Sequence, residues 1–437
     1  MNVPTRWGPY TNMKAIEDKG PIVIERGEGV YVWDEQGKRY LDAHGGLWLS
    51  NIGYGRKEIA QAIAKQAEKI SWFSSFGGFA NRPSLDLADR VIDILRPDGM
   101  GTIFFSNDGS GAVETSLKIA RQYWKLVGQP SKTKLIGRQH AYHGVSLGAL
   151  SVAGITPNRK MFEPLLKDVR HAPAPYQNHC SFHPQTQVCN YGCVNELERI
   201  IGFEDPSTIA AFIAEPIQAA GGVIIPPFDY LAKVREICRK NDILFIADEV
   251  VTGFGRLGKW TGSRYYGIQP DMMTFAKGIT SGYIPLGATA ISPQIYEAFI
   301  KSSTDVPEFR HGNTYSGHPL ACAAALANFD ILEQEKVPEN AAEMGVHLSE
   351  HLQQLVKDFP DFVVNAGSVG LLGRIELKLS PDMAPGKSGT IFSNKLLEKN
   401  IIVRPVGDVV TLSPPLVINK GELDEMMDPF RQILASL

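Results

Sequence analysis

The sequence of 437 residues predicts an α/β fold in which helices cover both faces of a mostly parallel sheet. Between about residues 57 and 300, short apolar runs alternate with helical patterns, which is typical of strand–helix–strand units. These apolar runs are continuous, as expected for strands that are buried on both faces. The chain is also too long for one ordinary core, so we expect two domains.

The expected elements follow in order along the chain. Residues 29–43 alternate between apolar and polar and turn at Gln36-Gly37, which predicts a β-hairpin, and residues 56–69 predict an amphipathic helix. In the α/β region we expect a helix at 111–124 and strands at 102–107, 134–138, 209–216, 244–250 and 272–276. Beyond residue 318 we expect an α+β tail with helices at 319–333 and 338–357, strands at 370–377 and 409–412, and a last helix.

The bulk composition argues against several classes of partner. The net charge is −3, from 44 basic and 47 acidic residues, which gives no electrostatic case for nucleic acid or an anionic membrane. The first residues lack the apolar run of a signal peptide, and no stretch has the length and character of a membrane span. Five cysteines, an odd number in a chain of this size, indicate reduced thiols and predict a cytoplasmic protein.

Three apolar runs end at charged residues, namely Glu215, Asp248 and Lys277. Lys277 is the only charged residue within residues 272–296. A lysine at the end of a buried strand either extends its amine to solvent or is paired, deprotonated or bonded to another group. Asp248 and the adjacent Glu249 either cap the following turn or face a cationic partner. Because the carboxyl ends of parallel strands hold the ligands of such sheets, we expect the three side chains to converge there.

A phosphate-binding turn is predicted at residues 108–111, which read DGSG between a strand and a helix. Glycines let the backbone approach an anion, the helix N-terminus offers free N–H groups, and Ser110 adds a hydroxyl. Glu114 stands where a dinucleotide fingerprint has its third glycine, so a single phosphate fits better. After the next strand, Tyr142 and His143 are candidates for stacking on a planar cofactor, although most tyrosines simply pack in cores.

Two glycine-rich patterns raise the alternative of a nucleotide-binding protein. Residues 253–258 match GxGxxG and residues 253–260 contain GxxxxGK, but Trp260 occupies the position at which a P-loop needs Ser or Thr. Residues 261–267 are broken by glycines and aromatics, so we expect no helix there and predict a glycine-rich turn.

A histidine- and cysteine-rich loop raises the alternative of a zinc site. Its candidate ligands are His179, Cys180, His183, Cys189 and Cys193. Their spacing is irregular, so we predict no metal.

The ordered set of motifs resembles the pyridoxal-phosphate-dependent aminotransferases of class III, which have fold type I. The motifs cover nearly the whole chain in the order GLWLSNIGYG, FFSNDGSGAVET, YHG, EPIQAAGG, ADEVVTGFGRLGKW, FAKG, HGNTYSGHP and RPVGDVVTLSPPL. They resemble most closely the ω-amino acid and amine:pyruvate transaminases. This resemblance implies pyridoxal 5'-phosphate as cofactor and a homodimer with shared active sites, with a tetramer as the larger alternative. It also implies a large domain at 57–320, containing a seven-stranded sheet, and a smaller domain built from 1–56 and 321–437.

The same resemblance implies a role for each residue of the cofactor site. Lys277 would form the Schiff base and shuttle the proton, and Asp248 would pair with the pyridine nitrogen. The other expected cofactor contacts are Gly109 and Ser110 at the phosphate, Tyr142 and Val250 on the two ring faces, His143, Glu215 as support for Asp248 and Tyr142, and Thr314 at the phosphate of the neighbouring subunit.

The resemblance further implies how substrates are recognised. Arg404 would swing in to pair with a carboxylate and out for an apolar amine, since a guanidinium suits a carboxylate. Trp48, with Phe76 and Phe79, would form the wall of the substrate pocket.

Three positions depart from the family pattern. Gly111 replaces the usual glutamate after Gly-Ser, and Val251 stands where the ornithine and γ-aminobutyrate branches carry glutamine. Ala220 stands where those branches carry a glutamate that gates the arginine, which favours a pocket for ω-amines. We therefore predict a transaminase that moves the amino group of a diamine, β-alanine, taurine or similar amine to pyruvate or another 2-oxo acid. A decarboxylase, racemase or aminomutase on the same scaffold is the alternative.

Overall fold

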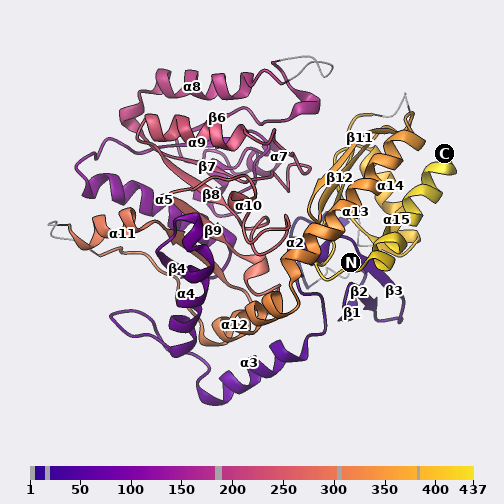
Figure 1. Ribbon diagram of the computed structural model, residues 1–437, viewed down its shortest axis with the longest axis horizontal. Helices are drawn as coiled ribbons and strands as arrows, with labels where there is room; N and C mark the ends of the chain where they lie inside the picture. Colours follow the sequence, from indigo (N-terminus) through magenta and orange to yellow (C-terminus); the bar gives the residue numbers. More distant parts are fainter. Residues whose placement is uncertain (1–4, 15–19, 183–188, 303–307, 381–383) are drawn as a thin grey trace.

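The computed structural model describes residues 5–14, 20–182, 189–302, 308–380 and 384–437. A seven-stranded sheet lies at the centre of the larger part of the molecule, in the order β4-β10-β9-β8-β7-β5-β6 (Figure 1). Its strands are β4 (Thr102–Ser106), β5 (Lys134–Arg138), β6 (Val169–Ala172), β7 (Ile209–Ala214), β8 (Leu244–Asp248), β9 (Met272–Phe275) and β10 (Gly287–Ile291). β10 alone runs opposite to the other six strands, which confirms the mostly parallel sheet.

Alternate residues of the central strands enter two separate cores. Ile213 and Ile246 pack in the core that contains α5 (Gly109–Leu126). Phe212 and Phe245 pack in the core that contains α9 (Tyr230–Lys240). Because both sets of side chains are apolar, these strands do not show the apolar–polar alternation that marks a half-exposed strand.

The remaining helices complete the layers around this sheet and form much of the second part of the molecule. The longer ones are α3 (Lys57–Lys69), α4 (Arg82–Leu95), α8 (Gly192–Glu204), α11 (Pro293–Ile300), α12 (Pro319–Gln334), α13 (Val337–Asp358), α14 (Ser388–Glu398) and α15 (Lys420–Ala435). The short ones are α2 (Gly45–Trp48), α6 (Leu147–Val152), α7 (Thr156–Arg159) and α10 (Gly262–Tyr265), with 3₁₀ turns η1 (Arg96–Asp98), η2 (Gln177–His179), η3 (Pro206–Thr208) and η4 (Lys277–Ile279). α12 packs against both α3 and α4. No helix within the described residues is long and apolar enough to span a bilayer.

Two four-stranded sheets lie beside the larger part, at the end that holds the C-terminal helices (Figure 1). One has the order β1-β2-β3-β13 and the other the order β11-β12-β15-β14. Their strands are β1 (Ile24–Glu28), β2 (Tyr31–Asp34), β3 (Arg39–Asp42), β11 (Val363–Val369), β12 (Leu372–Leu377), β13 (Ile401–Ile402), β14 (Arg404–Val406) and β15 (Val409–Leu412). β13 pairs with β3, so strands from both chain regions share one sheet. The domain limits at residues 56 and 320 stay a prediction.

One expected loop is a helix in the structure. Residues 261–267 were expected to be non-helical, but α10 forms a single turn there. The Thr261 hydroxyl accepts a hydrogen bond from the N–H of Arg264, which caps this turn. The buried carboxylate of Glu249 accepts from the N–H groups of Gly262 and Ser263. Side-chain acceptors thus stabilise a turn that the helical pattern does not reveal.

Candidate active site

A cavity of about 320 Å³ lies where β7, β8 and β9 end. Glu215 follows β7, Asp248 ends β8, and Lys277 follows β9, and all three line the cavity. The other predicted site residues in its wall are Gly109, Ser110, Tyr142, His143 and Val250. The departures Ala220 and Val251 line it as well. The structure therefore brings together the strand-end residues and the phosphate-binding turn.

Lys277 adopts a left-handed backbone conformation immediately after β9, with φ of 49°. This conformation is unusual for a residue other than glycine and is sustained only by the surrounding structure. The side chain forms no ion pair with any described residue, and its Nζ lies 5.0 Å from the centroid of the Trp48 ring. Burial lowers the pKa of Lys277 to about 8, although the charges of Asp248 and Glu215 act in the opposite direction. A substantial fraction of the amine is thus neutral near physiological pH.

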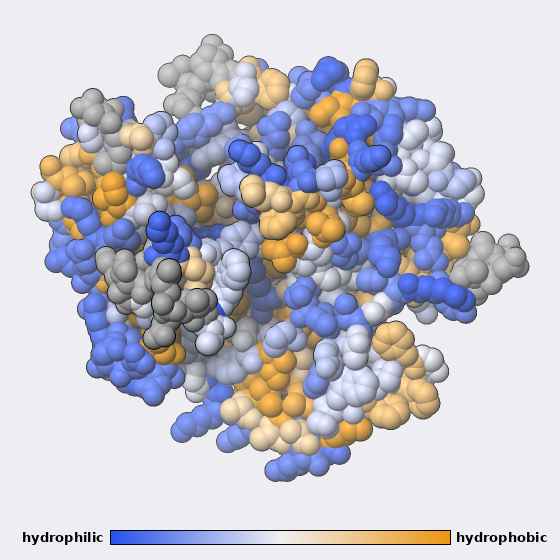
Figure 2. All heavy atoms as spheres, turned by 180° about the vertical axis from the view of Figure 1, so that it is seen from behind, coloured by the Kyte–Doolittle hydropathy of each residue, from blue (hydrophilic) through white to orange (hydrophobic). Residues whose placement is uncertain are grey.

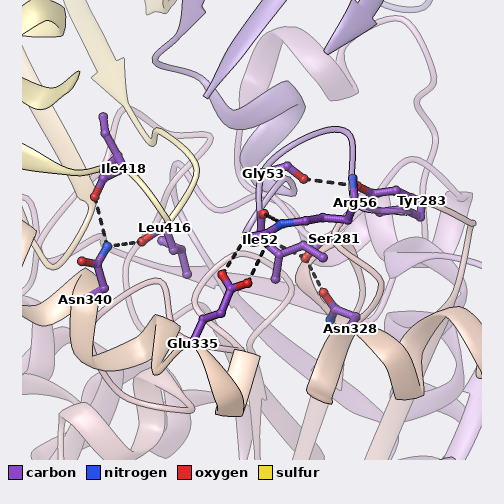
Figure 3. A network of polar contacts seen from close by, with 10 residues as sticks. All are labelled: Ile52, Gly53, Arg56, Ser281, Tyr283, Asn328, Glu335, Asn340, Leu416 and Ile418. Atoms are coloured by element: carbon purple, nitrogen blue, oxygen red, sulfur yellow. Dashed lines mark hydrogen bonds and ion pairs between the residues drawn. The ribbon is translucent and has the colours of Figure 1, made fainter. Parts of the chain in front are cut away.

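The network shown in Figure 3 holds the segment that follows Lys277. The amide of Asn328 on α12 donates to the carbonyls of Gly278 and Ile279, at 3.0 and 3.1 Å. Its oxygen accepts from the Ser281 hydroxyl at 2.7 Å. Asn328 is fully buried, and each of its polar atoms is paired. One side chain thus fixes two backbone carbonyls and one hydroxyl group shortly beyond the lysine.

The N-terminal region is bound to the same segment. The Tyr283 hydroxyl accepts from the N–H of Arg56 at 2.7 Å (Figure 3). The Arg56 guanidinium donates to the Ile52 carbonyl and forms a bidentate pair with Glu335 at the end of α12, with both distances 2.7 Å. Residues far apart in the sequence therefore hold one wall of the cavity in place.

Three donors orient the Asp248 carboxylate. The N–H of Val250 and the Thr274 hydroxyl each donate to Oδ1 at 3.1 Å, and His143 Nδ1 lies 2.7 Å from Oδ2. Both Asp248 and His143 are buried. Because a carboxylate only accepts hydrogen bonds, the shared proton belongs to His143 Nδ1. This arrangement fixes a negative charge at the cavity wall.

Glu215 is a second buried carboxylate beside the cavity. Its oxygens accept from the N–H groups of Tyr142 and Ala219, at 3.0 and 3.1 Å. Burial raises the pKa of Glu215 to about 7, and the neighbouring charge of Asp248 acts in the same direction, while His143 opposes it. Glu215 thus positions the backbone of Tyr142, and its carboxyl takes up a proton more readily than an exposed glutamate does.

The predicted phosphate-binding turn has the geometry of an anion cradle. Asp108 caps α5 by accepting from the N–H of Gly111 at 2.7 Å. The Ser110 hydroxyl accepts from the N–H of Val145 at 3.1 Å, so its own proton remains available to a ligand. At Gly144, where φ is +131°, a Cβ atom would lie 2.6 Å from Ser110 Oγ. Only glycine at this position leaves room for the hydroxyl.

Glu114 does not face this cradle. Its carboxylate accepts from the Ser146 hydroxyl at 2.6 Å and from the N–H groups of Gly148 and Ala149, at 2.9 and 3.2 Å, at the start of α6. Its negative charge is therefore engaged away from a bound phosphate. At the departure Gly111, a Cβ atom would lie 3.3 Å from that of Ser106, which disfavours a larger side chain there.

Arg404 and Trp48 lie together beside Lys277, although neither of them lines the cavity. Arg404 Cζ is 4.8 Å from the centroid of the Trp48 ring, and Lys277 Nζ is 5.0 Å from it. Arg404 forms no ion pair with any described residue, and burial lowers the pKa of its guanidinium. His44 meets the Trp48 ring edge-on at 4.6 Å, and burial lowers its pKa to about 3. A neutral His44 thus sits beside the two cations without adding charge.

Three predicted site residues lie apart from the cavity. Phe76, Phe79 and Thr314 are exposed on this chain, and none of them lines the cavity. Phe76 instead borders a second cavity of about 330 Å³ together with His311 and Gly312. The role expected of Thr314 concerns a neighbouring subunit, and that of Phe76 and Phe79 concerns the substrate pocket; these roles stay predictions.

The sequence analysis missed Tyr10 in the neighbourhood of the site. Burial raises the pKa of the Tyr142 phenol, and a hydrogen bond with Tyr10 contributes in the same direction. Tyr10 belongs to the N-terminal segment, whose composition gives no signal for this position. Long-range placement of a chain end cannot be derived from local patterns.

The glycine-rich segment at 253–258 is not an accessible nucleotide loop. Most of its residues are buried, and Arg256 donates from inside it to the carbonyls of Leu371 and Pro414 and to Asn51 Oδ1. A Cβ atom at Gly253 would lie 2.8 Å from the Glu249 carbonyl oxygen. The predicted turn is confirmed, and its backbone serves internal packing.

The cysteine-rich loop has internal partners where it is described. His179 Nε2 lies 2.6 Å from Glu376 Oε1, and Cys180 Sγ accepts from the N–H of Phe182. Burial raises the pKa of Cys193 to about 11, and the nearby Cys189 and Cys180 act in the same direction. His183 lies outside the described residues, so the absence of a metal here stays a prediction.

The chain belongs to the class-III aminotransferases, whose family profile matches residues 13–434. It is therefore a pyridoxal-phosphate-dependent enzyme of fold type I. It is similar to the putrescine–pyruvate aminotransferase of Pseudomonas aeruginosa, with 40% identity over 98% of this chain and 93% of the relative. The β-alanine–pyruvate aminotransferase of the same organism is 37% identical over 99% and 96%. A crystal structure of an amine transaminase from an uncultivated Pseudomonas species, in the PLP-bound form, has a TM-score of 0.95 and 39% identity over 99% of both chains.

The residues of this chain fit that cofactor. The cavity offers a fixed carboxylate at Asp248, an amine at Lys277 with a lowered pKa, and a glycine-walled anion cradle at Ser110. Gly109 packs closely on Val250, since a Cβ atom at Gly109 would lie 3.2 Å from its side chain. The cavity thus presents the three kinds of group that a phosphorylated pyridine aldehyde requires.

Proposed function

We propose that this aminotransferase is an ω-transaminase that takes the amino group of a terminal amine and passes it to pyruvate or another 2-oxo acid. The observation that carries this proposal is the half-buried guanidinium of Arg404, which has no acidic partner among the described residues. It lies against Trp48, close to Lys277. A carboxylate entering the cavity finds a free cation there, and the aromatic ring accommodates the guanidinium when the substrate has no carboxylate.

The cavity wall at Ala220 supports the choice of donor. Ala220 lines the cavity and adds no charge. A carboxylate at this position would compete with a substrate for Arg404, whereas alanine leaves the arginine free for the acceptor. The relatives named for putrescine and pyruvate and for β-alanine and pyruvate support the same donor and acceptor classes. Diamines, β-alanine and taurine are the donors that we propose.

In this proposal, each of the predicted cofactor-site residues has a defined role. Bound pyridoxal phosphate supplies an electron-accepting ring that stabilises negative charge on the substrate carbon. Lys277 would hold the cofactor through its Nζ, and its amine would carry the proton to and from the substrate carbon. Asp248 would keep the ring nitrogen protonated, while Tyr142 and Val250 would hold the two ring faces.

The anion cradle at Gly109 and Ser110 is proposed to bind the phosphate. The backbone at Gly109 and the Ser110 hydroxyl would donate hydrogen bonds to it, and the helix N-terminus of α5 would favour its negative charge. Glu215 supports Asp248 and Tyr142, and His143 orients the Asp248 carboxylate.

We also propose a homodimer with shared sites, located in the cytoplasm. Thr314, Phe76 and Phe79 are exposed on the single chain and are available to a second copy. Figure 2 shows hydrophobic residues reaching the surface of the rear face in several patches, as expected where subunits meet. All five cysteines are free, which supports a reducing compartment.

A panel of amines tests the proposed reaction. Putrescine, β-alanine, taurine, γ-aminobutyrate and an aryl amine are added singly to the purified holoenzyme without a 2-oxo acid, and the visible absorbance of the bound cofactor is followed. We expect loss of the visible band with terminal amines, and its return, with stoichiometric alanine, when pyruvate is added. A decarboxylase or a racemase would release carbon dioxide or an inverted amino acid and form no alanine, which would overturn the proposal.

A further inference from the structure

Two histidines on α13 and one aspartate on α15 direct their ligand atoms at one another, away from the candidate active site. Nε2 of His347 and Nε2 of His351 are 3.3 Å apart. Both approach Oδ1 of Asp424, at 2.9 and 2.7 Å. Among the described residues, no other set of three His, Cys, Asp or Glu side chains brings its ligand atoms within 4.8 Å of one another. The two histidines are one helical turn apart, so they lie on the same face of α13.

The geometry of these atoms fits a tetrahedral metal ion. Bonds of about 2.0–2.1 Å at tetrahedral angles place neighbouring ligand atoms about 3.3–3.4 Å apart. The separation of the two Nε2 atoms, 3.3 Å, has this value. The two distances to Asp424 are hydrogen-bond lengths, so the carboxylate would withdraw by about 0.5 Å to admit the ion. Its side chain is 44% exposed, which leaves it free to do so.

We propose that His347, His351 and Asp424 form a binding site for a divalent transition-metal cation, with Zn²⁺ as the expected ion and water in the fourth position. Imidazole and carboxylate ligands suit Zn²⁺ well, and hard cations such as Mg²⁺ would prefer an all-oxygen set. α13 and α15 pack side by side at the C-terminal end of the molecule (Figure 1). An ion at this site cross-links the two helices and stabilises the folded state, because only the folded chain presents the site.

Two neighbouring groups set the affinity in opposite directions. Glu350 Oε2 lies 3.4 Å from His347 Nδ1 and favours a proton there when a metal replaces the proton that Nε2 shares with Asp424. Arg431 Nη2 lies 2.6 Å from His351 Nδ1, and this contact requires a lone pair on Nδ1 and hence a proton on Nε2. Metal binding must therefore displace Arg431, which has Asp428 as an alternative partner at 3.7 Å. Arg431 weakens the site without being a ligand.

The experiment is a Zn²⁺ titration of the chelator-treated, desalted holoenzyme with any affinity tag removed, followed by calorimetry, with Co²⁺ as a spectroscopic probe. We expect one equivalent of Zn²⁺ and a Co²⁺ spectrum without sulfur-to-metal bands. H351A and D424N should each raise the Kd for Zn²⁺ at least about 100-fold, since losing a ligand exceeds the 10–100-fold effect of an outer partner. R431Q should lower the Kd about 10-fold. Zn²⁺ should raise the thermal unfolding temperature of the wild type, and it should not raise that of H351A or D424N.

D358N is the matched control, because Asp358 is an exposed carboxylate on α13 that pairs with Gln354. It should leave the Kd unchanged. The proposal is overturned if the wild type binds no Zn²⁺, if H351A and D424N bind as tightly as D358N, or if Co²⁺ reports thiolate ligands and so places the ion on the cysteine-rich loop. R431Q separates a metal site from a purely structural cluster even if a ligand variant fails to fold, since a structural cluster predicts no tighter binding.

Discussion

Replacing Asn328 with aspartate should destabilise the segment that carries Lys277. The amide nitrogen of Asn328 donates to the carbonyls of Gly278 and Ile279, and no water replaces these bonds because the side chain is fully buried. An aspartate has the same shape but presents oxygen to both carbonyls. Each buried acceptor left without a donor costs about 1–3 kcal/mol, so the ionised variant should lose about 2–6 kcal/mol of unfolding free energy.

The assay is urea unfolding of N328D beside N340D. Asn340 is a matched control because its amide also donates to two carbonyls, those of Leu416 and Ile418 at 2.6 and 3.0 Å, but at a half-exposed position (Figure 3). Leu416 and Ile418 are buried, but the half-exposed side chain at position 340 lets the new carboxylate turn towards water instead of facing their carbonyls, so N340D should lose less, about 1–2 kcal/mol. N328D should also lose most of its transaminase activity, whereas N340D should keep it.

The pH dependence sharpens this test. A protonated aspartate still donates to one carbonyl, and burial raises the pKa of such a carboxyl, so the defect of N328D should grow as the pH rises from 5 to 8. Equal losses of unfolding free energy in N328D and N340D, or an N328D loss below about 1 kcal/mol, would show that the Asn328 bonds do not hold the lysine segment.

Three further predictions concern the cavity. G144A should weaken pyridoxal phosphate binding about 10-fold or more, because a Cβ atom would press on the Ser110 hydroxyl. G128A is the control, since its Cβ atom would have nothing within 4 Å, and it should bind the cofactor normally. Equal binding by the two variants would refute the role of the cradle. With a Lys277 pKa of about 8, the rate at which the cofactor-free protein takes up pyridoxal phosphate should rise between pH 7 and 9 and then level off, and a flat profile would contradict a lowered pKa. R404A should raise the KM for pyruvate strongly and that for a carboxylate-free amine little, so equal changes in both KM values would exclude a role in carboxylate binding.

The central sheet could be predicted from local patterns because its strands are short, apolar and bounded by turns. The strand at 134–138 and that at 409–412 have the predicted limits. β10 was missed because Gly287–Ile291 follows a glycine- and proline-rich loop and contains small residues. β6, with the sequence VRHA, was missed because an edge strand is only partly apolar.

The candidate site shows a similar division. Glu215, Asp248 and Lys277 could be placed together because the ends of parallel strands meet at one edge. Asn328 interrupts an apolar helix, and a buried amide needs hydrogen-bond partners, so the sequence indicates that this side chain is bonded to something. The sequence does not indicate which groups those partners are. The expected place of Thr314 depends on a second subunit, and no pattern within one chain fixes that contact. His347 and His351 have helical ligand spacing, but the carboxylate on α15 becomes their neighbour only in the fold.

Chemical trapping tests the central claim most directly. The holoenzyme is reduced with borohydride, which makes the link between the cofactor and its lysine permanent, and is then digested and analysed by mass spectrometry. We expect the pyridoxyl group on the peptide that contains Lys277 and on no other lysine peptide, and we expect no such adduct in K277A. A pyridoxyl group on a different lysine, or an unmodified Lys277 peptide in fully loaded enzyme, would contradict the assignment of this residue and of the cavity around it.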